Sequence, residues 1–478
     1  MADYGNKELR SVLSIRERGA MKMWAVLPLL GVLLFAKAWP AVPAVDPKEV
    51  QQILKEAIDN RRTVGIVVGI VDANGNKIFS HGKTARDGRN VDGDSVFEIG
   101  SATKTFTATL LADMIKRGLV SMDDPASKYL PDTVKIPSRG GREITLLDLA
   151  TQRSGLPRMP TNFKPADAEN PYADYSVEKM YEFLSSYQLL RDIGAKYEYS
   201  NLGVGLLGHI LARKAGLSYE ALLAERIFRP LEMNSTAIVL TPDMSSRLAA
   251  GHSSGLTPEK NWDLNALAGA GAIRSTVNDM MKYVAAYMEL KPSPLSAAME
   301  MAQQDRNDTT GRDLRIGLAW HLLKRPDSVI VWHNGGTGGY HSFVGFDRKR
   351  GVGVVVLSNS TNDIDDIGFH LVDPQIPLAK FEARKERKEI AVDPRVFDAY
   401  VGEYRLAPNF VLSITKEGQQ LFLQATGQAR LRLHPESETE FFILEADAQV
   451  SFVKDSTGKV GHLILHQGGR DQRAERIK

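Results

Sequence analysis

Hydrophobic residues form short β-branched runs near both ends of the first 380 residues and recur at helical spacing between them. The run 64–71, followed by Asn74-Gly75 and a second run at 77–80, predicts a β-hairpin with an Asn-Gly turn. Further strands are expected at 316–320, 329–332, 343–347 and 352–357. Strands on both sides of a helical middle predict one antiparallel sheet covered by helices, with a helical subdomain inserted.

Helices are expected in the middle of the chain, where apolar residues recur every three or four positions. One long helix begins at Ser101, and its apolar positions are Phe106, Leu110, Leu111, Met114 and Ile115. Other helices are expected at 144–150, 177–187, 202–215 and 277–290. The run Gly203–Gly208 fits a dinucleotide fingerprint, but no buried strand precedes it, so we interpret its glycines as sites of close helix packing.

The pattern changes near residue 390. Residues 381–389 are a mixed run of charges, which is typical of a solvated linker. Beyond Asp393-Pro394, short alternating runs separated by turns predict a small up-and-down antiparallel barrel or sandwich. These runs are 410–414, 421–424, 430–433, 441–444, 450–453 and 460–465.

The expected fold class is therefore α+β, an antiparallel sheet flanked by helices, with a small all-β barrel appended at the C-terminus. We expect four segments along the chain. They are an N-terminal signal or anchor segment at 1–45, a main domain at 46–380, a charged linker at 381–394 and the small β-barrel domain at 395–478.

The N-terminal segment contains an apolar run, Trp24–Ala36, between Lys22 and Lys37. Its length is typical of the hydrophobic part of a signal peptide and short for a membrane span. Ala36-Lys37-Ala38 fits a small-x-small cleavage pattern. Cleavage and an uncleaved membrane anchor at residues 24–39 both stay open, and in either case we expect the main domain outside the cytoplasm.

Composition excludes several classes of chemistry. Sixty Lys and Arg against 58 Asp and Glu give a formal charge of +2, so no nucleic-acid partner is expected. The chain has no cysteine, which excludes disulfides and thiolate chemistry. Its ten histidines show no metal-ligand spacing, and we expect no metal and no cofactor.

Candidate chemistry begins at Ser101 and Lys104, in the first turn of the long helix. Positions i and i+3 share one face of a helix, so the lysine amine can lie beside the serine hydroxyl and accept its proton. That arrangement converts a weak nucleophile into an acylating one. Ser-x-x-Lys is the first motif of β-lactamases and penicillin-binding proteins.

The same spacing occurs at five other places, where the local sequence predicts a purely structural role. Ser176 is interpreted as the N-cap of a helix, and the remaining pairs lie in alternating strands or in turns. These remaining pairs are Ser80/Lys83, Ser413/Lys416, Ser451/Lys454 and Ser456/Lys459. Ser253 in Gly251–Gly255 fits a nucleophile elbow, but without the required strand and helix it is expected in a loop.

Two further motifs follow in order. Tyr199-Ser200-Asn201 precedes a helix, where a tyrosine hydroxyl can relay protons and an asparagine can either bind a substrate amide or fix Lys104. His333-Asn334-Gly335-Gly336 follows an apolar strand, where glycines allow a substrate to lie against the backbone. The N–H groups of Ser101 and Gly336 are candidates for an oxyanion hole.

With these motifs in this order, the chain resembles the class C β-lactamase and D-alanyl-D-alanine-peptidase family of serine hydrolases. The resemblance runs from about Val64 to Leu371. It includes the three motifs and the segments Asp124–Pro131, Ile144–Thr151 and Phe228–Leu231. The C-terminal region resembles the barrel-like module attached to many family members.

The resemblance implies that Ser101 is the acylated nucleophile and that Lys104 and Tyr199 share the base and acid work. It implies substrate-binding roles for Asn201, His333, Gly335 and Gly336. The implied substrate is a small molecule or peptide, namely a β-lactam, a D-amino-acid peptide or an ester.

One position departs from the family pattern, because class C β-lactamases usually carry Lys-Thr-Gly where this chain has His333-Asn334-Gly335. Histidine is only partly charged near neutral pH, so a peptidase or esterase is favoured over a dedicated β-lactamase. A short-chain carboxylesterase and a catalytically weak penicillin- or peptidoglycan-binding protein stay open as alternatives. A carbohydrate- or lipid-binding role centred on the barrel is less favoured, because the sequence of the barrel shows no cluster of exposed aromatic residues.

Overall fold

The computed structural model describes residues 46–380 except 310 and 312, then 387, 389–407, 410–426, 430–443, 448–467 and 470–478. The expected signal or anchor segment at 1–45 lies outside the described residues, as does most of the charged run 381–389. Among the helices of the described residues, none combines the length and the apolar character that a membrane span requires.

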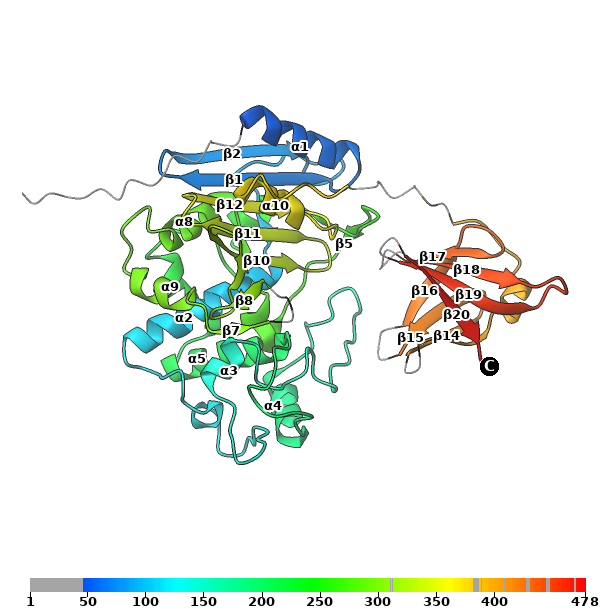
Figure 1. Cartoon of the computed structure of the whole chain (residues 1–478), viewed down its shortest axis with the longest axis horizontal. Coiled ribbons are helices and arrows are strands. Elements are labelled where there is room, and N and C mark those ends of the chain that lie inside the picture. The colour runs from blue at the N-terminus through cyan, green and yellow to red at the C-terminus, as the bar shows by residue number, and fades with distance from the viewer. Residues whose placement is uncertain are drawn as a thin grey trace, which may run out of the picture. The chain divides into compact units, whose positions relative to one another are not determined.

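Within the described residues, eight antiparallel strands form the central sheet in the order β2-β1-β12-β11-β10-β9-β8-β7 (Figure 1). Their bounds are β1 (Gly65–Asp72), β2 (Gly75–Gly82), β7 (Asn307–Asp308), β8 (Leu314–Ile316), β9 (His321–Lys324), β10 (Val329–Gly336), β11 (His341–Asp347) and β12 (Val352–Ser358). Val68 of β1 lies opposite Val356 of β12, so both ends of the domain meet in one sheet. The predicted antiparallel sheet is confirmed.

Two local predictions need correction. The hairpin exists, but its two-residue loop is Ala73-Asn74, and Gly75 opens β2 with a φ of +120°. The strand expected at 316–320 is wrong, because the chain turns between β8 and β9 and the amide of Gly317 donates to the carbonyl of Trp320 at 2.8 Å. That run is apolar because Leu318 and Trp320 are fully buried in the core, not because it joins the sheet.

Helices cover both faces of the sheet. Successive side chains of β1 point to opposite faces and are apolar on both, so both faces must be buried. Ile66, Val68 and Ile70 pack in one cluster with α1 (Pro47–Asp59) and α10 (Asp365–Val372). Val67 and Val71 belong to the larger cluster, which includes α2 (Thr103–Lys116) and α8 (Val277–Tyr287). The second face therefore supports the helix that follows Ser101.

The inserted helical subdomain lies beside α2. Its helices are α3 (Leu146–Ala150), α4 (Val177–Ser186), α5 (Asn201–Ala215), α6 (Tyr219–Leu223) and α7 (Pro242–Ser246), and α9 (Ser296–Ala302) follows α8. Short elements are η1 (Gly100–Ala102), η2 (Ala126–Tyr129), η3 (Ala224–Phe228), η4 (Asn265–Ala270), β3 (Phe97–Glu98), β6 (Arg274–Ser275), β4 (Gly251–His252) and β5 (Pro258–Glu259). A Cβ on Gly208 of α5 would lie 2.9 Å from the Cα of Gly269, so close packing of α5 on η4 accounts for the glycine-rich run.

The C-terminal strands close into a barrel in the order β13 to β20, which confirms the predicted all-β module. After η5 (Pro394–Ala399) they are β13 (Gly402–Ala407), β14 (Phe410–Glu417), β15 (Gln420–Ala425), β16 (Arg430–Pro435), β17 (Glu440–Phe442), β18 (Ala448–Lys454), β19 (Val460–Gln467) and β20 (Arg470–Arg476). Its interior is aromatic, with the rings of Tyr400 and Phe452 stacked at 4.1 Å. The alternating pattern did not predict β13 and β20, and β20 is mostly polar along its length.

Candidate active site

Ser101 lies in the short 3₁₀ turn η1, immediately before α2. Gly100 has a φ of +49°, and a Cβ there would lie 2.8 Å from the amide nitrogen of Gly336 on β10. The carbonyl of Ile99 accepts a hydrogen bond from Ser342 Oγ on β11 at 2.8 Å. The turn that carries Ser101 is therefore held directly against the end of the sheet.

Lys104 lies one helical turn after Ser101 and is fully buried. Its Nζ lies 2.9 Å from Ser101 Oγ and donates to the carbonyl of Ala270 at 2.6 Å. Burial lowers the pKa of Lys104 well below its ordinary value of 10.5, and the positive charge of Arg158 lowers it further. A neutral amine in this position has a lone pair for the serine proton.

We expect the rate of Ser101 acylation by a neutral ester to rise with pH as Lys104 loses its proton and to level off well below pH 10.5. The titratable groups that face Lys104 are Arg158, Tyr199, His321 and His333. The charge on Lys104 lowers the pKa of both histidines, and burial lowers them more, so neither gains charge in this range. A pH profile of kcat/KM checks this, and a rate that falls with rising pH would contradict a neutral lysine base.

Tyr199 lies in the loop before α5, with its ring beside the Lys104 amine and the Arg158 guanidinium. Its ring centroid is 4.8 Å from Lys104 Nζ and 5.1 Å from Arg158 Cζ. Burial raises the pKa of Tyr199 to about 12, although a hydrogen bond with Ser101 and the charge of Arg158 act in the opposite direction. The phenol thus keeps its proton at neutral pH and is suited to donate it, while Lys104 is suited to accept one.

Asn201 begins α5, and the preceding Ser200 caps the helix by accepting from the amide of Gly203 at 2.8 Å. The Nδ2 of Asn201 lies 3.7 Å from the sulfur of Met159. Its Oδ1 is buried and has no hydrogen-bond partner within the described part of the chain. That oxygen is available to accept from a substrate N–H, and the binding role of Asn201 stays a prediction.

His333 lies on β10 and is 1% exposed. Its Nδ1 is 2.6 Å from the carbonyl oxygen of Asn334, which can only accept, so Nδ1 carries the hydrogen of the neutral ring. Its Nε2 is buried without a partner among the described residues. Burial, then the charges of His321 and Lys104, hold the pKa of His333 well below 6.5, so the ring presents a lone pair and no positive charge.

Gly335 and Gly336 differ in their surroundings. A Cβ on Gly335 would lie 2.0 Å from the carbonyl oxygen of Ile99 and 2.9 Å from the amide nitrogen of Ser101. Gly336 is exposed, and the nearest atom to a Cβ there is the Tyr340 carbonyl oxygen at 4.0 Å. Gly335 thus permits the contact of β10 with the Ser101 turn, and Gly336 leaves its own surface open.

The motifs in the sequence did not reveal two residues at this site. Arg158 is an exposed cation on the loop between α3 and α4, and His321 on β9 stacks on His333 with ring centroids 5.0 Å apart. The Nε2 of His321 lies 3.1 Å from the Tyr197 hydroxyl. Neither residue lies in a motif, so nothing in a single sequence distinguishes them from other surface arginines or core histidines.

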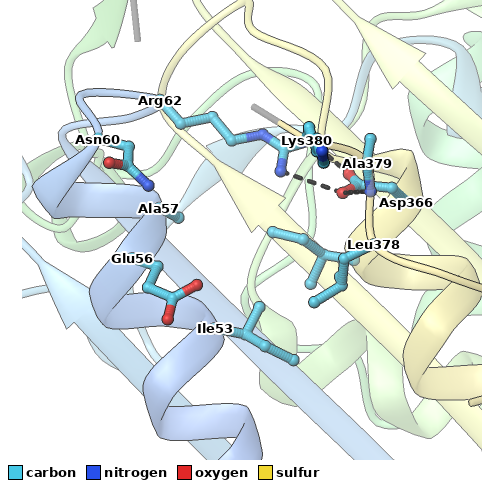
Figure 2. Close-up of a pocket in the computed structure, with 10 residues that line it drawn as sticks. Ile53, Glu56, Ala57, Asn60, Arg62, Asp366, Leu378, Ala379 and Lys380 are labelled. Carbon is cyan, nitrogen blue, oxygen red and sulfur yellow. Dashed lines mark hydrogen bonds and ion pairs between the residues drawn. The ribbon is translucent and has the colours of Figure 1, made fainter. Parts of the chain in front are cut away.

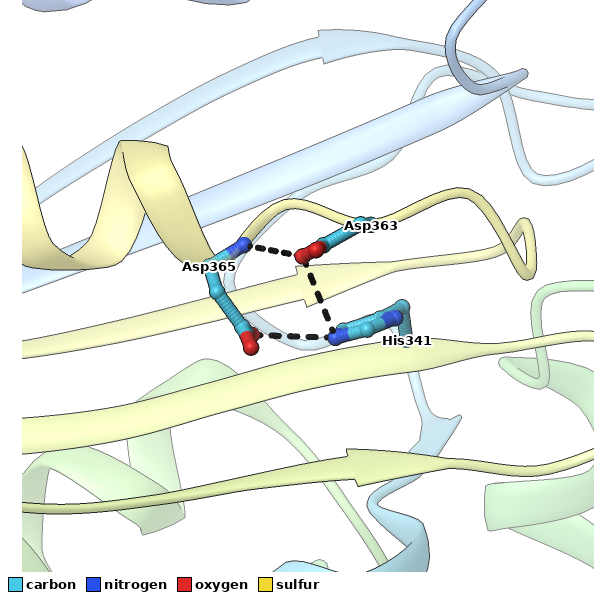
Figure 3. Close-up of side chains that lie close together, drawn as sticks. All are labelled: His341, Asp363 and Asp365. Atoms are coloured by element: carbon cyan, nitrogen blue, oxygen red, sulfur yellow. Dashed lines mark hydrogen bonds and ion pairs between the residues drawn. The ribbon is translucent and has the colours of Figure 1, made fainter. Parts of the chain in front are cut away.

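His341, Asp363 and Asp365 form the one group of three possible metal ligands among the described residues, with ligand atoms within 4.8 Å of one another (Figure 3). These side chains already hydrogen-bond within the group, because His341 Nε2 lies 3.0 Å from Asp365 Oδ1. The other oxygen of Asp365 accepts from Asn334 Nδ2 at 2.6 Å. Asp365 therefore connects β10 to β11 beside His333, and we assign the group a supporting role.

A pocket of about 190 Å³ lies between α1, α10 and the segment Leu378–Lys380 (Figure 2). Its wall includes the ion pair between Arg62 and Asp366. None of its lining residues belongs to the three motifs, so it is separate from the candidate active site.

Comparisons with known proteins identify a family and several relatives for this chain. The family model described as Beta-lactamase matches residues 50–371, and a domain of unknown function, DUF3471, matches residues 386–476. The D-alanyl-D-alanine-carboxypeptidase/endopeptidase AmpH of Escherichia coli is 30% identical over 66% of this chain and 86% of its own length. Penicillin-binding protein 4* of Bacillus subtilis is 27% identical over 80% of this chain and 88% of its own.

Among solved structures, the beta-lactamase/D-alanine carboxypeptidase of Yersinia pestis superposes with a TM-score of 0.61. It is 25% identical, and the match covers 70% of this chain and all of that one. The shared part corresponds in extent to the α+β domain and not to the whole chain.

Proposed function

This chain belongs to the beta-lactamase family and is a serine hydrolase, and we propose that its acyl-enzyme forms on Ser101 with Lys104 as the base. One observation carries the assignment. A buried lysine amine with a lowered pKa lies 2.9 Å from the serine oxygen, at the start of a helix and against the end of the sheet. A lysine whose pKa is lowered by burial is more readily neutral, as a general base must be.

In the proposed acylation, Ser101 Oγ attacks the substrate carbonyl carbon and its proton passes to Lys104 Nζ. The carbonyl oxygen becomes an anion that the N–H groups of Ser101 and Gly336 stabilise. The proton on Lys104 then passes through the Tyr199 hydroxyl to the leaving nitrogen or oxygen, and the bond to the leaving group breaks. The products of this step are an ester on Ser101 and a protonated leaving group.

Deacylation reverses the direction of proton transfer. A water molecule attacks the ester carbonyl and gives a proton to the neutral amine of Lys104. Ser101 Oγ leaves and recovers a proton from Lys104 or Tyr199. Because Tyr199 has a pKa of about 12, it returns to the neutral phenol after each relay.

We propose D-amino-acid peptides or β-lactams as the substrates, in keeping with the names of the relatives. Short-chain esters are the second candidate, favoured by the neutral state of His333, since an ester substrate needs no cation at this position. A panel of β-lactams, D-alanyl peptides and p-nitrophenyl esters discriminates between them by kcat/KM.

We also propose a location outside the cytoplasm. The support is the apolar run Trp24–Ala36 between two lysines, which is typical of a signal peptide. Fractionation of cells that express the full chain, with N-terminal sequencing of the product, tests both the location and cleavage near Ala38.

The first test of the proposal is covalent labelling. Treatment with a fluorophosphonate or a β-lactam should attach one adduct to the tryptic peptide Asn90–Lys104. Since that peptide contains both Ser95 and Ser101, tandem mass spectrometry is needed to locate the adduct on Ser101. Ser101→Ala should abolish labelling and Ser253→Ala should not, whereas an adduct on Ser253 or Ser95 would overturn the proposal.

A further inference from the structure

The proposed function does not yet identify the positively charged residue that would bind the carboxylate of a substrate. His333 occupies the position where class C relatives usually carry lysine, but its ring is buried and neutral. With Nδ1–H directed to the Asn334 carbonyl, the free nitrogen is Nε2, which can accept a hydrogen bond but cannot donate one. A carboxylate has only acceptor oxygens, so His333 in this state does not suit it.

Arg158 supplies a cation at the same site from a different element. Its guanidinium lies 5.1 Å from the centroid of the Tyr199 ring, the same ring that Lys104 Nζ approaches at 4.8 Å. The side chain is exposed, in contrast to the fully buried Lys104. A guanidinium at this point is accessible to a ligand that has reached Ser101.

The backbone of Arg158 is held in place by the motif that carries Tyr199. Its carbonyl accepts from the amides of Asn201 and Leu202 at 3.0 and 3.3 Å, at the start of α5. One residue earlier, the Pro157 carbonyl accepts from Ser200 Oγ at 2.7 Å. The loop and the Tyr199-Ser200-Asn201 turn are therefore joined, so Arg158 is positioned relative to the catalytic groups.

The charge of Arg158 is uncompensated in the described part of the chain, where no carboxylate forms an ion pair with it. The charge of Arg158 also affects the titration of its neighbours. It lowers the pKa of Lys104 and acts to lower the pKa values of Tyr172, Tyr197 and Tyr199. A cation that lies against the Tyr199 ring but has no carboxylate partner favours an anionic ligand at that place.

We propose that Arg158, and not His333, binds the substrate carboxylate, so that the enzyme selects acyl donors that carry a free carboxylate. The planar guanidinium can bind both oxygens of a carboxylate at once, which a histidine or a lysine cannot. This inference rests on the proposed acyl-enzyme mechanism and assigns Arg158 a role in specificity. His333 Nε2 is left to accept from a substrate N–H or O–H.

The test uses two thioesters of benzoylglycine that differ in one group. The first has mercaptoacetate as its leaving group, with a free carboxylate, and the second has the methyl ester of mercaptoacetate. We expect the wild-type protein to prefer the first. Arg158→Gln should lower kcat/KM for the carboxylated thioester by about 10- to 100-fold, the size of a charge-assisted hydrogen bond, mainly through KM. Because removal of Arg158 also raises the pKa of Lys104, rates are compared on the high-pH plateau of each variant, where the methyl ester should be little affected.

Two further variants control for charge and folding. Arg158→Lys keeps the charge but loses the two-pronged geometry, and its rate on the carboxylated thioester should lie between those of the wild type and Arg158→Gln. Lys164→Gln removes an exposed cation from the same loop and should behave as the wild type. Each variant is also checked by its thermal transition and by fluorophosphonate labelling of Ser101.

The outcomes separate this inference from the proposed function. If Ser101 of the wild-type protein is not labelled, the proposed acyl-enzyme mechanism itself is wrong. If Ser101 is labelled but the wild-type protein shows no preference for the carboxylated thioester, the proposed role of Arg158 is wrong. Equal losses on both thioesters, together with a shift of the pH profile to higher pH, would mean that Arg158 acts only by lowering the pKa of Lys104, and would also overturn it.

Discussion

Replacement of Lys104 by methionine or alanine is expected to lower the acylation rate of Ser101 by about 10²- to 10⁴-fold, the usual contribution of a general base. The reason is that Lys104 Nζ is the basic group beside Ser101 Oγ, at 2.9 Å, and burial lowers its pKa well below 10.5, which favours the neutral amine. Methionine keeps most of the side-chain volume, so loss of packing is small. Single-turnover kinetics with a p-nitrophenyl ester measure the effect.

Lys179→Ala is the matched control, because Ser176 and Lys179 have the same spacing. There Ser176 Oγ accepts from the backbone amide of Lys179 as a helix cap, while the lysine amine pairs with Asp174 at 2.9 Å. Activity in this variant should equal that of the wild type. A Lys104→Met protein that is folded and retains wild-type acylation would refute the assignment of the base.

Replacement of Gly335 by alanine should lower acylation by on the order of 10²-fold or more, although residue 335 carries no reacting group. The added methyl group would lie 2.0 Å from the Ile99 carbonyl oxygen and 2.9 Å from the Ser101 amide, so β10 and the nucleophile turn must separate. Such a displacement misplaces Ser101 relative to the proposed oxyanion hole. A lower melting temperature is expected as well.

Gly336→Ala adds the same methyl group to the adjoining residue, where the nearest atom lies 4.0 Å away. It keeps the amide N–H, and its acylation rate and melting temperature should stay close to wild-type values. Equal effects of the two substitutions would show that the steric contact with the Ser101 turn is not what requires glycine at position 335.

Much of this molecule follows from local sequence patterns, because those patterns reflect forces that act over a few residues. A continuous run of valines and isoleucines predicts β1, since each face of the strand contacts a separate hydrophobic cluster. The spacing of Ser101 and Lys104 predicts that their side chains meet, since a helical turn brings i and i+3 together. Alternation predicts the barrel strands in the same way, except for β13 and the largely polar β20.

Other features depend on residues that are far apart in the sequence, so only the tertiary structure determines them. The apolar run 316–320 is a buried turn, because burial in the core makes a segment hydrophobic whether or not it pairs in the sheet. The neutral state of His333 arises from burial and from Lys104 and His321, which lie far from it in the sequence or on another strand. The cation beside Tyr199 comes from Arg158 on a loop whose path no local pattern specifies. The sequence by itself predicted that Ser101 and Lys104 lie side by side at the start of a helix. Charge and exposure at the proposed substrate-binding positions depend on the fold, because desolvation and electrostatic fields are summed over everything that packs around a group.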